Sequence, residues 1–133
     1  MAGSALFAQD NAVIAQTPSA THVDKEGYLV TMASGTATIS SSATVPATGV
    51  ILEGRTTSAK SSIGILGALS GLVRLKCSGT IAEGARVQQH TDGSIVTDTG
   101  TGARVVVGVL TQPGGAVSGD LALVAVHTPL TLS

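Results

Sequence analysis

Short stretches in which hydrophobic and polar residues alternate run along most of the chain. The clearest is GLVRLKCS, residues 71–78, where the apolar side chains of Val73, Leu75 and Cys77 are separated by basic ones. Successive side chains of a β-strand point to opposite faces of its sheet, so this period of two predicts a strand with one buried face.

Similar alternation, or a short apolar run bounded by turn residues, predicts about nine short strands. They cover residues 26–33, 36–40, 49–54, 62–69, 71–78, 84–90, 94–97, 103–111 and 120–127. No segment has a convincing helical period. Strands at this spacing are typical of a β-barrel or a β-sandwich, so we expect a single all-β domain over residues 23–133.

Glycine-containing turns separate these strands. Asp92-Gly93 lies between two predicted strands and is the strongest short-range hairpin signal, because both turn positions of such a hairpin need positive φ. Glu83-Gly84 indicates a turn that opens the 84–90 strand, and Gly100-Thr101-Gly102 indicates a hairpin loop before the 103–111 strand.

Two predicted strands are apolar on both faces, around Val105–Val107 and Leu121–Val126. A strand of this kind is buried on both sides, either by a second layer of the same chain or by a neighbouring subunit. Our hypothesis for the subunit contacts names five side chains: Val105, Val107, Leu121, Val124 and Val126.

Residues 1–22 differ from the rest of the chain. They are rich in Ala, Ser and Gln, with isolated hydrophobic side chains, and they end near Pro18. We expect an extended N-terminal arm. Two interpretations stay open: a frayed terminus, or an arm that docks Leu6, Phe7, Val13 and Ile14 on another chain and becomes ordered only there.

Composition narrows the possible functions. Hydrophobic residues make up 43% of the chain, but aromatic residues only 2% and charged residues only 11%, with a net charge of −1. A basic stripe and an aromatic platform are both missing, which argues against nucleic-acid binding. A surface with so little charge is poorly protected against association, so we expect partners to cover part of it.

The residues that could carry chemistry are few, and local structure accounts for most of them. Cys77 continues the apolar face of its strand, so we expect a buried side chain rather than a reactive thiol. His90 and Asp92 have a spacing that could place both on one metal, but Asp92 is explained by its turn. No nucleophile or phosphate-binding motif is present. The sequence therefore predicts no enzyme, no cofactor and no metal site.

The chain also lacks the signals of secretion or membrane insertion. Its N-terminus has no basic region, and Asp10 and Asn11 interrupt the apolar residues, so we expect no signal peptide. The longest apolar stretch, residues 63–73, is too short to span a bilayer. We expect a soluble protein that is made where it assembles and has no membrane partner.

Four turn and strand elements, in order, give the chain a resemblance to a known family. They are Ser78-Gly79-Thr80-Ile81-Ala82-Glu83-Gly84, Asp92-Gly93, Val107-Gly108-Val109, and Gly119-Asp120 leading into residues 121–126. In this order and spacing, over residues 63–126, the chain resembles the capsid cement (decoration, head-stabilising) proteins of tailed bacteriophages. The N-terminal third has no comparable elements.

The resemblance implies a small β-barrel or β-tulip-like domain that forms a homotrimer at three-fold or quasi-three-fold positions of the capsid. Its partner would be the major capsid protein, and its location the outer surface of the virion after assembly in the host cytoplasm. The arm residues would then contact the capsid. Two alternatives stay open: another phage structural component, such as a tail or fibre protein, and a non-catalytic module that binds a carbohydrate or ice.

Overall fold

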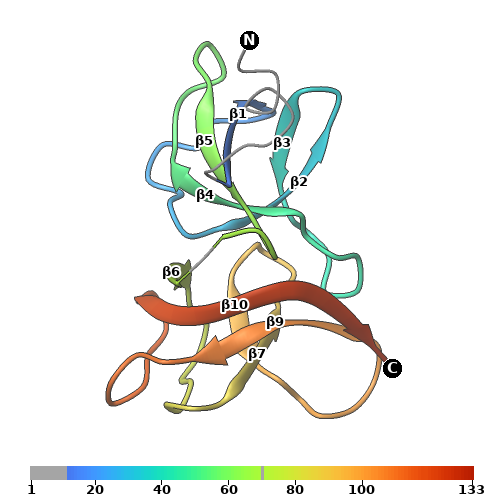
Figure 1. Cartoon of the computed structure of the whole chain (residues 1–133), viewed down its shortest axis with the longest axis vertical. Coiled ribbons are helices and arrows are strands. Elements are labelled where there is room, and N and C mark those ends of the chain that lie inside the picture. Colours follow the sequence, from blue (N-terminus) through green and yellow to red (C-terminus); the bar gives the residue numbers. More distant parts are fainter. Residues whose placement is uncertain (1–11, 70) are drawn as a thin grey trace, which may run out of the picture.

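The computed structural model describes residues 12–69 and 71–133, and its secondary structure is all β (Figure 1). Within these ranges the chain forms ten strands and no helix. The strands are β1 (Val13–Pro18), β2 (Leu29–Ala33), β3 (Thr36–Ile39), β4 (Gly49–Glu53), β5 (Ser61–Ile65), β6 (Leu72–Lys76), β7 (Arg86–Gln89), β8 (Ile95–Thr97), β9 (Arg104–Leu110) and β10 (Leu121–Leu132). Nine of them are the predicted strands, so the predicted all-β class is confirmed.

The first five strands close into a small barrel in the order β1-β3-β2-β4-β5. All neighbours are antiparallel except β1 and β3, which run parallel. The tight turn between β2 and β3 has Ser34 at φ 52° and Gly35 at φ 78°. Positive φ at two successive residues matches the right-handed twist of a two-residue hairpin, so this turn sets the pairing of the two strands.

The last five strands form a second sheet in the order β6-β10-β9-β7-β8, which lies below the barrel in Figure 1. This sheet bends until its ends meet, because a parallel bridge joins Cys77, just after β6, to Ile95 on β8. The Ser78 amide donates to the Ile95 carbonyl at 2.9 Å beside that bridge. The second sheet is therefore closed on itself at one end.

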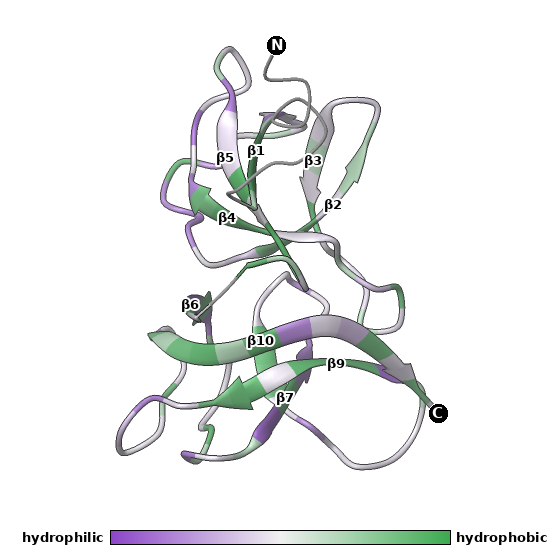
Figure 2. Ribbon diagram, viewed as in Figure 1, coloured by the Kyte–Doolittle hydropathy of each residue, from purple (hydrophilic) through white to green (hydrophobic). Residues whose placement is uncertain are grey.

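Hydrophobic segments occur along the strands of both sheets (Figure 2). Two groups of buried side chains form the core. The smaller one fills the barrel: Val30, Ala37, Ile51 and Ile63. The larger one fills the bent second sheet and continues to the lower end of the barrel, where Leu29, Val50 and Leu66 join it. Since one apolar cluster spans both sheets, burial of its surface stabilises their packing together.

Three hydrogen bonds of one side chain also join the two halves of the fold. The side chain of Gln89, on β7, is fully buried. Its Oε1 accepts from the Ala47 amide at 2.7 Å, and its Nε2 donates to the carbonyls of Ser42 and Val45 at 3.1 and 2.9 Å. One β7 side chain thus satisfies three backbone groups in the connection between β3 and β4.

The arm prediction is wrong for the part of it that the structure describes. Val13 and Ile14 belong to β1, which pairs antiparallel with β5 from Val13↔Gly64 to Gln16↔Ser61. Their side chains are partly buried in the barrel instead of being free to dock elsewhere. The sequence of β1 alternates poorly and ends in Pro18, so its strand structure comes from pairing with two distant strands. Leu6 and Phe7 lie outside the described residues.

Candidate interaction surface

Three of the five side chains predicted to contact another subunit are core residues of this chain. Val105, Val107 and Val124 are each 0% exposed and belong to the larger core cluster. A side chain without exposed surface cannot form a direct subunit contact in this conformation, so the hypothesis is wrong for these three. Val126 is partly buried and packs against the same core, and only Leu121 has a large exposed fraction, 40%.

The chain itself covers the other face of β9. The connection between β8 and β9 was expected to be a hairpin loop, but β7 lies between these two strands in the sheet, so the connection has to cross over β7. Along this crossing the Thr99 amide donates to Gln88 Oε1 at 2.9 Å, and Asp98 pairs with Arg104. Val106 is 1% exposed and Arg104 7%. Burial of β9 on both faces is therefore intramolecular.

Asp98 and two arginines hold the connection between β8 and β9 in place. Asp98 accepts from Arg104 Nε and from the Gly100 amide, and its Oδ2 lies 3.3 Å from Arg86 Nη2. Burial by itself would raise the pKa of Asp98. The hydrogen bonds from Gly100 and Arg104, together with the charges of both arginines, instead hold it below its ordinary value. These groups satisfy one another, so we assign them a structural role.

The exposed surface closest to the predicted interface is the outward side of β6 and β10. Register pairs Lys76 with Leu121, Arg74 with Leu123, and Leu72 with Ala125. The residues between them on each strand, such as Leu75 and Ala122, face the core. We call the six outward-facing residues the β6–β10 face: Leu72, Arg74, Lys76, Leu121, Leu123 and Ala125.

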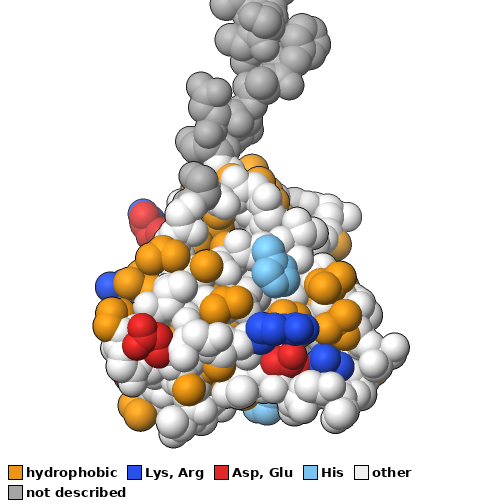
Figure 3. Space-filling model, turned by 60° about the horizontal axis from the view of Figure 1, so that its bottom comes forward, with side chains coloured by type: hydrophobic (Ala, Val, Ile, Leu, Met, Phe, Trp, Pro, Cys, Tyr) orange, Lys and Arg blue, Asp and Glu red, His pale blue; other side chains and the backbone are white. Residues whose placement is uncertain are grey.

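The β6–β10 face combines exposed leucines with basic side chains. Leu72 is 53% exposed and Leu121 40%. Arg74 Nη1 donates to the Leu121 carbonyl at 3.0 Å, and Lys76 Nζ donates to the Gly119 carbonyl at 2.9 Å, so both cations are held close to the backbone. Figure 3 shows hydrophobic side chains beside charged ones at the second-sheet end of the molecule. This mixture suits contact with another protein surface.

A hollow of about 170 Å³ borders this face. It lies where the turn before β10 meets β6 and β10. Its lining includes the charged side chains of Arg74 and Asp120 and the apolar side chain of Leu121. The Asp120 carboxylate is already engaged, because its Oδ2 accepts from the Val117 amide at 2.9 Å. The hollow is small for an organic ligand and matches the size of a side chain from a partner.

The residues weighed for catalysis are held by local structure. Cys77 is 2% exposed, and burial raises the pKa of its thiol. Asp92 Oδ1 accepts from the Ser94 amide at 3.0 Å and from the Ser94 hydroxyl. Burial acts to raise the pKa of Asp92, but these bonds hold it below its ordinary value. Asp92 therefore serves the turn, as the sequence predicts, but the expected positive φ is found at Gly93 and not at Asp92. The predicted burial of Cys77 is confirmed.

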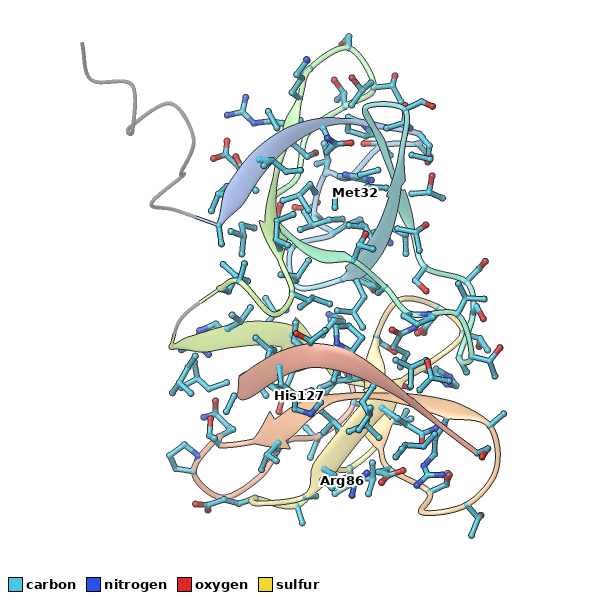
Figure 4. All side chains as sticks on the ribbon, turned by 45° about the vertical axis from the view of Figure 1, so that its right-hand side comes forward. Met32, Arg86 and His127 are labelled. Atoms are coloured by element: carbon cyan, nitrogen blue, oxygen red, sulfur yellow. The ribbon has the colours of Figure 1, made fainter. Side chains whose placement is uncertain are left out.

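The three histidines belong to different parts of the fold: His22 lies between β1 and β2, His90 just after β7, and His127 on β10. His127 is on β10, across the second sheet from Arg86 on β7, while Met32 marks the barrel (Figure 4). His127 is exposed and its Nδ1 lies 2.7 Å from the Thr128 carbonyl. In the ranges 12–69 and 71–133, no three His, Cys, Asp or Glu side chains gather as a metal site would require. The same ranges hold no helix long and apolar enough to cross a membrane.

The sequence pattern gave no sign that His22 is a buried polar residue. It was assigned to the arm, yet its ring is 1% exposed, beside Ser61 at one end of the barrel. It lies between Thr21 and Val23, and no alternating pattern around it indicates burial. Comparison with known proteins adds no assignment: no family model matches the chain, and no curated protein matches its sequence.

Proposed function

We propose that this protein is a capsid decoration (cement) protein of a tailed bacteriophage. In this role it binds the outer surface of the head and stabilises it by bridging neighbouring copies of the major capsid protein. The order of glycine turns over residues 63–126 suggested the role, and each falls in a turn or strand of the second sheet. The protein acts through contact, without a cofactor.

The observation that carries the proposal is the β6–β10 face. Two exposed leucines lie next to two basic side chains on a pair of antiparallel strands, in a chain of which only 11% of the residues are charged. Leucines supply apolar area to bury, and Arg74 and Lys76 attract a surface rich in Asp or Glu. We assign this face to contact with the major capsid protein.

Bridging works best when several copies act together. In the proposed homotrimer at a three-fold position, each copy would contribute one β6–β10 face. Once the first copy is bound, the second and third engage at high effective concentration, so weak single contacts add up to stable attachment. Of the five side chains first expected between copies, Leu121 is thus assigned to the capsid contact, and Val126 remains a candidate for the contact between copies.

Head binding tests the proposal directly. The purified chain is mixed with expanded and unexpanded heads of its own phage, sedimented, and the sites are imaged by electron microscopy. We expect occupancy of three-fold or quasi-three-fold sites on expanded heads. Absence of binding to both forms would overturn the proposal. Binding at the tail, or an elongated trimer in solution scattering, would favour the tail or fibre alternative.

Variants locate the contact. Leu72→Ser combined with Leu121→Ser should weaken head binding at least about tenfold, since each removes buried apolar area. Val45→Ser is the matched control, because Val45 is 56% exposed but lies on the barrel connection. An equal loss of head binding in both variants would show that the β6–β10 face is not the contact with the capsid. Deletion of residues 2–11 tests the remaining part of the predicted arm and leaves β1 intact.

A further inference from the structure

β1 is held in the barrel by two unequal pairings. On one side it pairs with β5 at four positions, and on the other it runs parallel to β3 at two, Thr17↔Thr36 and Pro18↔Ala37. The Thr17 amide donates to the Gly35 carbonyl at 2.9 Å and the Ser19 amide to the Ala37 carbonyl at 3.0 Å, while Pro18 between them has no amide proton to donate. At two register positions, the β1–β3 pairing is as short as the β2–β4 pairing and shorter than the other three pairings of the barrel.

The buried ring of His22 contacts the strands on both sides of β1. Its Nδ1 lies 3.0 Å from Ser61 Oγ on β5. The Ala37 backbone on β3 lies close enough to affect the pKa of the ring. The main chain of His22 is fixed as well, since its amide donates to the Arg55 carbonyl at 2.8 Å. His22 thus links β3, β5 and the connection between β4 and β5 at the end of β1.

The hydrogen bonds around the ring suit a neutral histidine. The Arg55 amide donates to Ser61 Oγ at 3.0 Å, which leaves the hydroxyl proton free to go to His22 Nδ1. If the ring gained a proton, Nδ1 would become a donor and the hydroxyl proton would lose its acceptor. His22 Nε2 and Gln16 Oε1, both buried, have no hydrogen-bond partner in the described part of the chain. Protonation would therefore place an uncompensated charge inside the barrel.

In the ranges 12–69 and 71–133, no carboxylate forms a hydrogen bond or ion pair with the His22 ring. Among the described residues no ion pair reaches the ring, and β1 and β3 carry no charged side chain. Glu26 Oε2 is committed to the Gly54 amide at 2.8 Å, and Glu53 to Arg55. The charged residues of the segments around His22 are partly or fully exposed: Asp24, Lys25, Glu26, Glu53, Arg55 and Lys60.

We propose that His22 is an acid-sensitive latch that keeps β1 in the barrel, so that acidification separates β1 from β3 while the second sheet stays folded. The inference concerns a conformational step within this chain and does not depend on the proposed capsid function. Separation of β1 from β3 would open the barrel and expose the facing edges of these two strands.

The direction of the pH effect follows from burial. Burial lowers the pKa of His22 below its ordinary value, and the nearby Ala37 backbone offsets only part of that effect. Once β1 opens, the exposed ring would titrate near about 6.5. The closed state is therefore favoured above that pH and loses stability as the pH falls below it, by up to about tenfold in the opening equilibrium per pH unit.

Amide hydrogen exchange measured by NMR tests the latch. Protection factors of the Thr17 and Ser19 amides are compared with that of the Thr111 amide, which donates to Leu123 in the second sheet. Between pH 7.5 and 5.0 we expect the two β1 amides to lose protection at least about tenfold relative to Thr111. A constant ratio, or loss of protection by all three amides together, would overturn the proposal.

Variants and ring titration complete the test. His22→Phe should make the ratio independent of pH, and His127→Gln, at an exposed ring, should leave the pH effect intact. If His22→Phe does not fold, Ser61→Ala serves instead: it should lower protection of the β1 amides at pH 7.5 and keep the pH effect. If ¹⁵N shifts showed the His22 ring to be protonated at pH 6 while the β1 amides remain protected, the latch would also be contradicted.

Discussion

The Leu29 amide donates to the Gly93 carbonyl at 2.8 Å, and this bond connects β2 of the barrel to the β7–β8 turn of the second sheet. Gly93 is buried at φ 85°. A Cβ at this position would lie 2.6 Å from Ile39 Cγ2 and 3.3 Å from the Leu29 carbonyl. The turn therefore needs glycine for its conformation and also for the close approach of the two sheets.

Gly93→Ala tests this close approach. Positive φ alone should cost about 1 kcal/mol of unfolding free energy, and the contact with Ile39 should add roughly 1–3 kcal/mol. Gly79→Ala is the matched control, because Gly79 has φ 74° with no atom within 4 Å of the added carbon. Urea denaturation measures both. Equal losses would show that the turn conformation, and not the contact between sheets, determines the requirement.

Gln89→Glu tests the polar contact between the sheets. The carboxylate keeps the bond to the Ala47 amide but cannot donate to Ser42 and Val45, so two carbonyls lose their partner. We expect a loss of roughly 2–5 kcal/mol at pH 7, smaller at acidic pH where the new carboxyl can donate once. Gln112→Glu is the control, since Gln112 only accepts, from the Leu123 amide. Similar losses in both variants would contradict this role of Gln89.

Asp98→Asn should destabilise the chain by roughly 2–3 kcal/mol at pH 7, because a charged acceptor for Arg104 and Gly100 is replaced by a neutral one. The pKa of Asp98 is lowered, so its contribution is present above the unfolded value of about 3.9 and is lost as the pH falls from there toward the lower folded value. Stability curves from pH 7 to 2 should therefore be flatter for the variant. Asp24→Asn changes an exposed residue and is the control. Its unfolding free energy should fall with decreasing pH as it does in the parent chain.

Cys77 should react slowly with thiol reagents in the folded protein. Its side chain is buried and its raised pKa leaves little thiolate near neutral pH. We expect labelling with a colorimetric disulfide reagent at pH 8 to be at least roughly 100-fold slower than in urea. Rapid labelling without denaturant would mean that the backbone β-bridge between Cys77 and Ile95 opens in the native state.

The local pattern predicted much of this fold because most strands carry their own signal. The alternation around Val73 and Leu75 gives the buried face of β6, and Asp92-Gly93 gives the β7–β8 turn. β10 is longer than expected: it continues past Pro129 to Leu132, after a register shift between Val126 and Leu130. A bulge of that kind depends on the neighbouring strand and leaves no local pattern.

What the sequence does not contain is the closure of the sheets. β1 becomes a strand only because β3 and β5 lie on either side of it, and β9 is buried on both faces because the chain crosses over β7. The same apolar run of valines would fit a neighbouring subunit equally well. His22 shows the limit most clearly, since its burial depends on Ser61, which lies 39 residues further along the chain.

Closure also affects how this protein behaves when it is concentrated. Open strand edges are templates on which further chains add and aggregate. The barrel has no open edge, and in the second sheet the Cys77–Ile95 bridge joins the two outermost strands. β8 at one of those ends has only three residues. A chain rich in Val and Ile, with few charges to keep copies apart, is thus protected from amyloid-like growth by its topology.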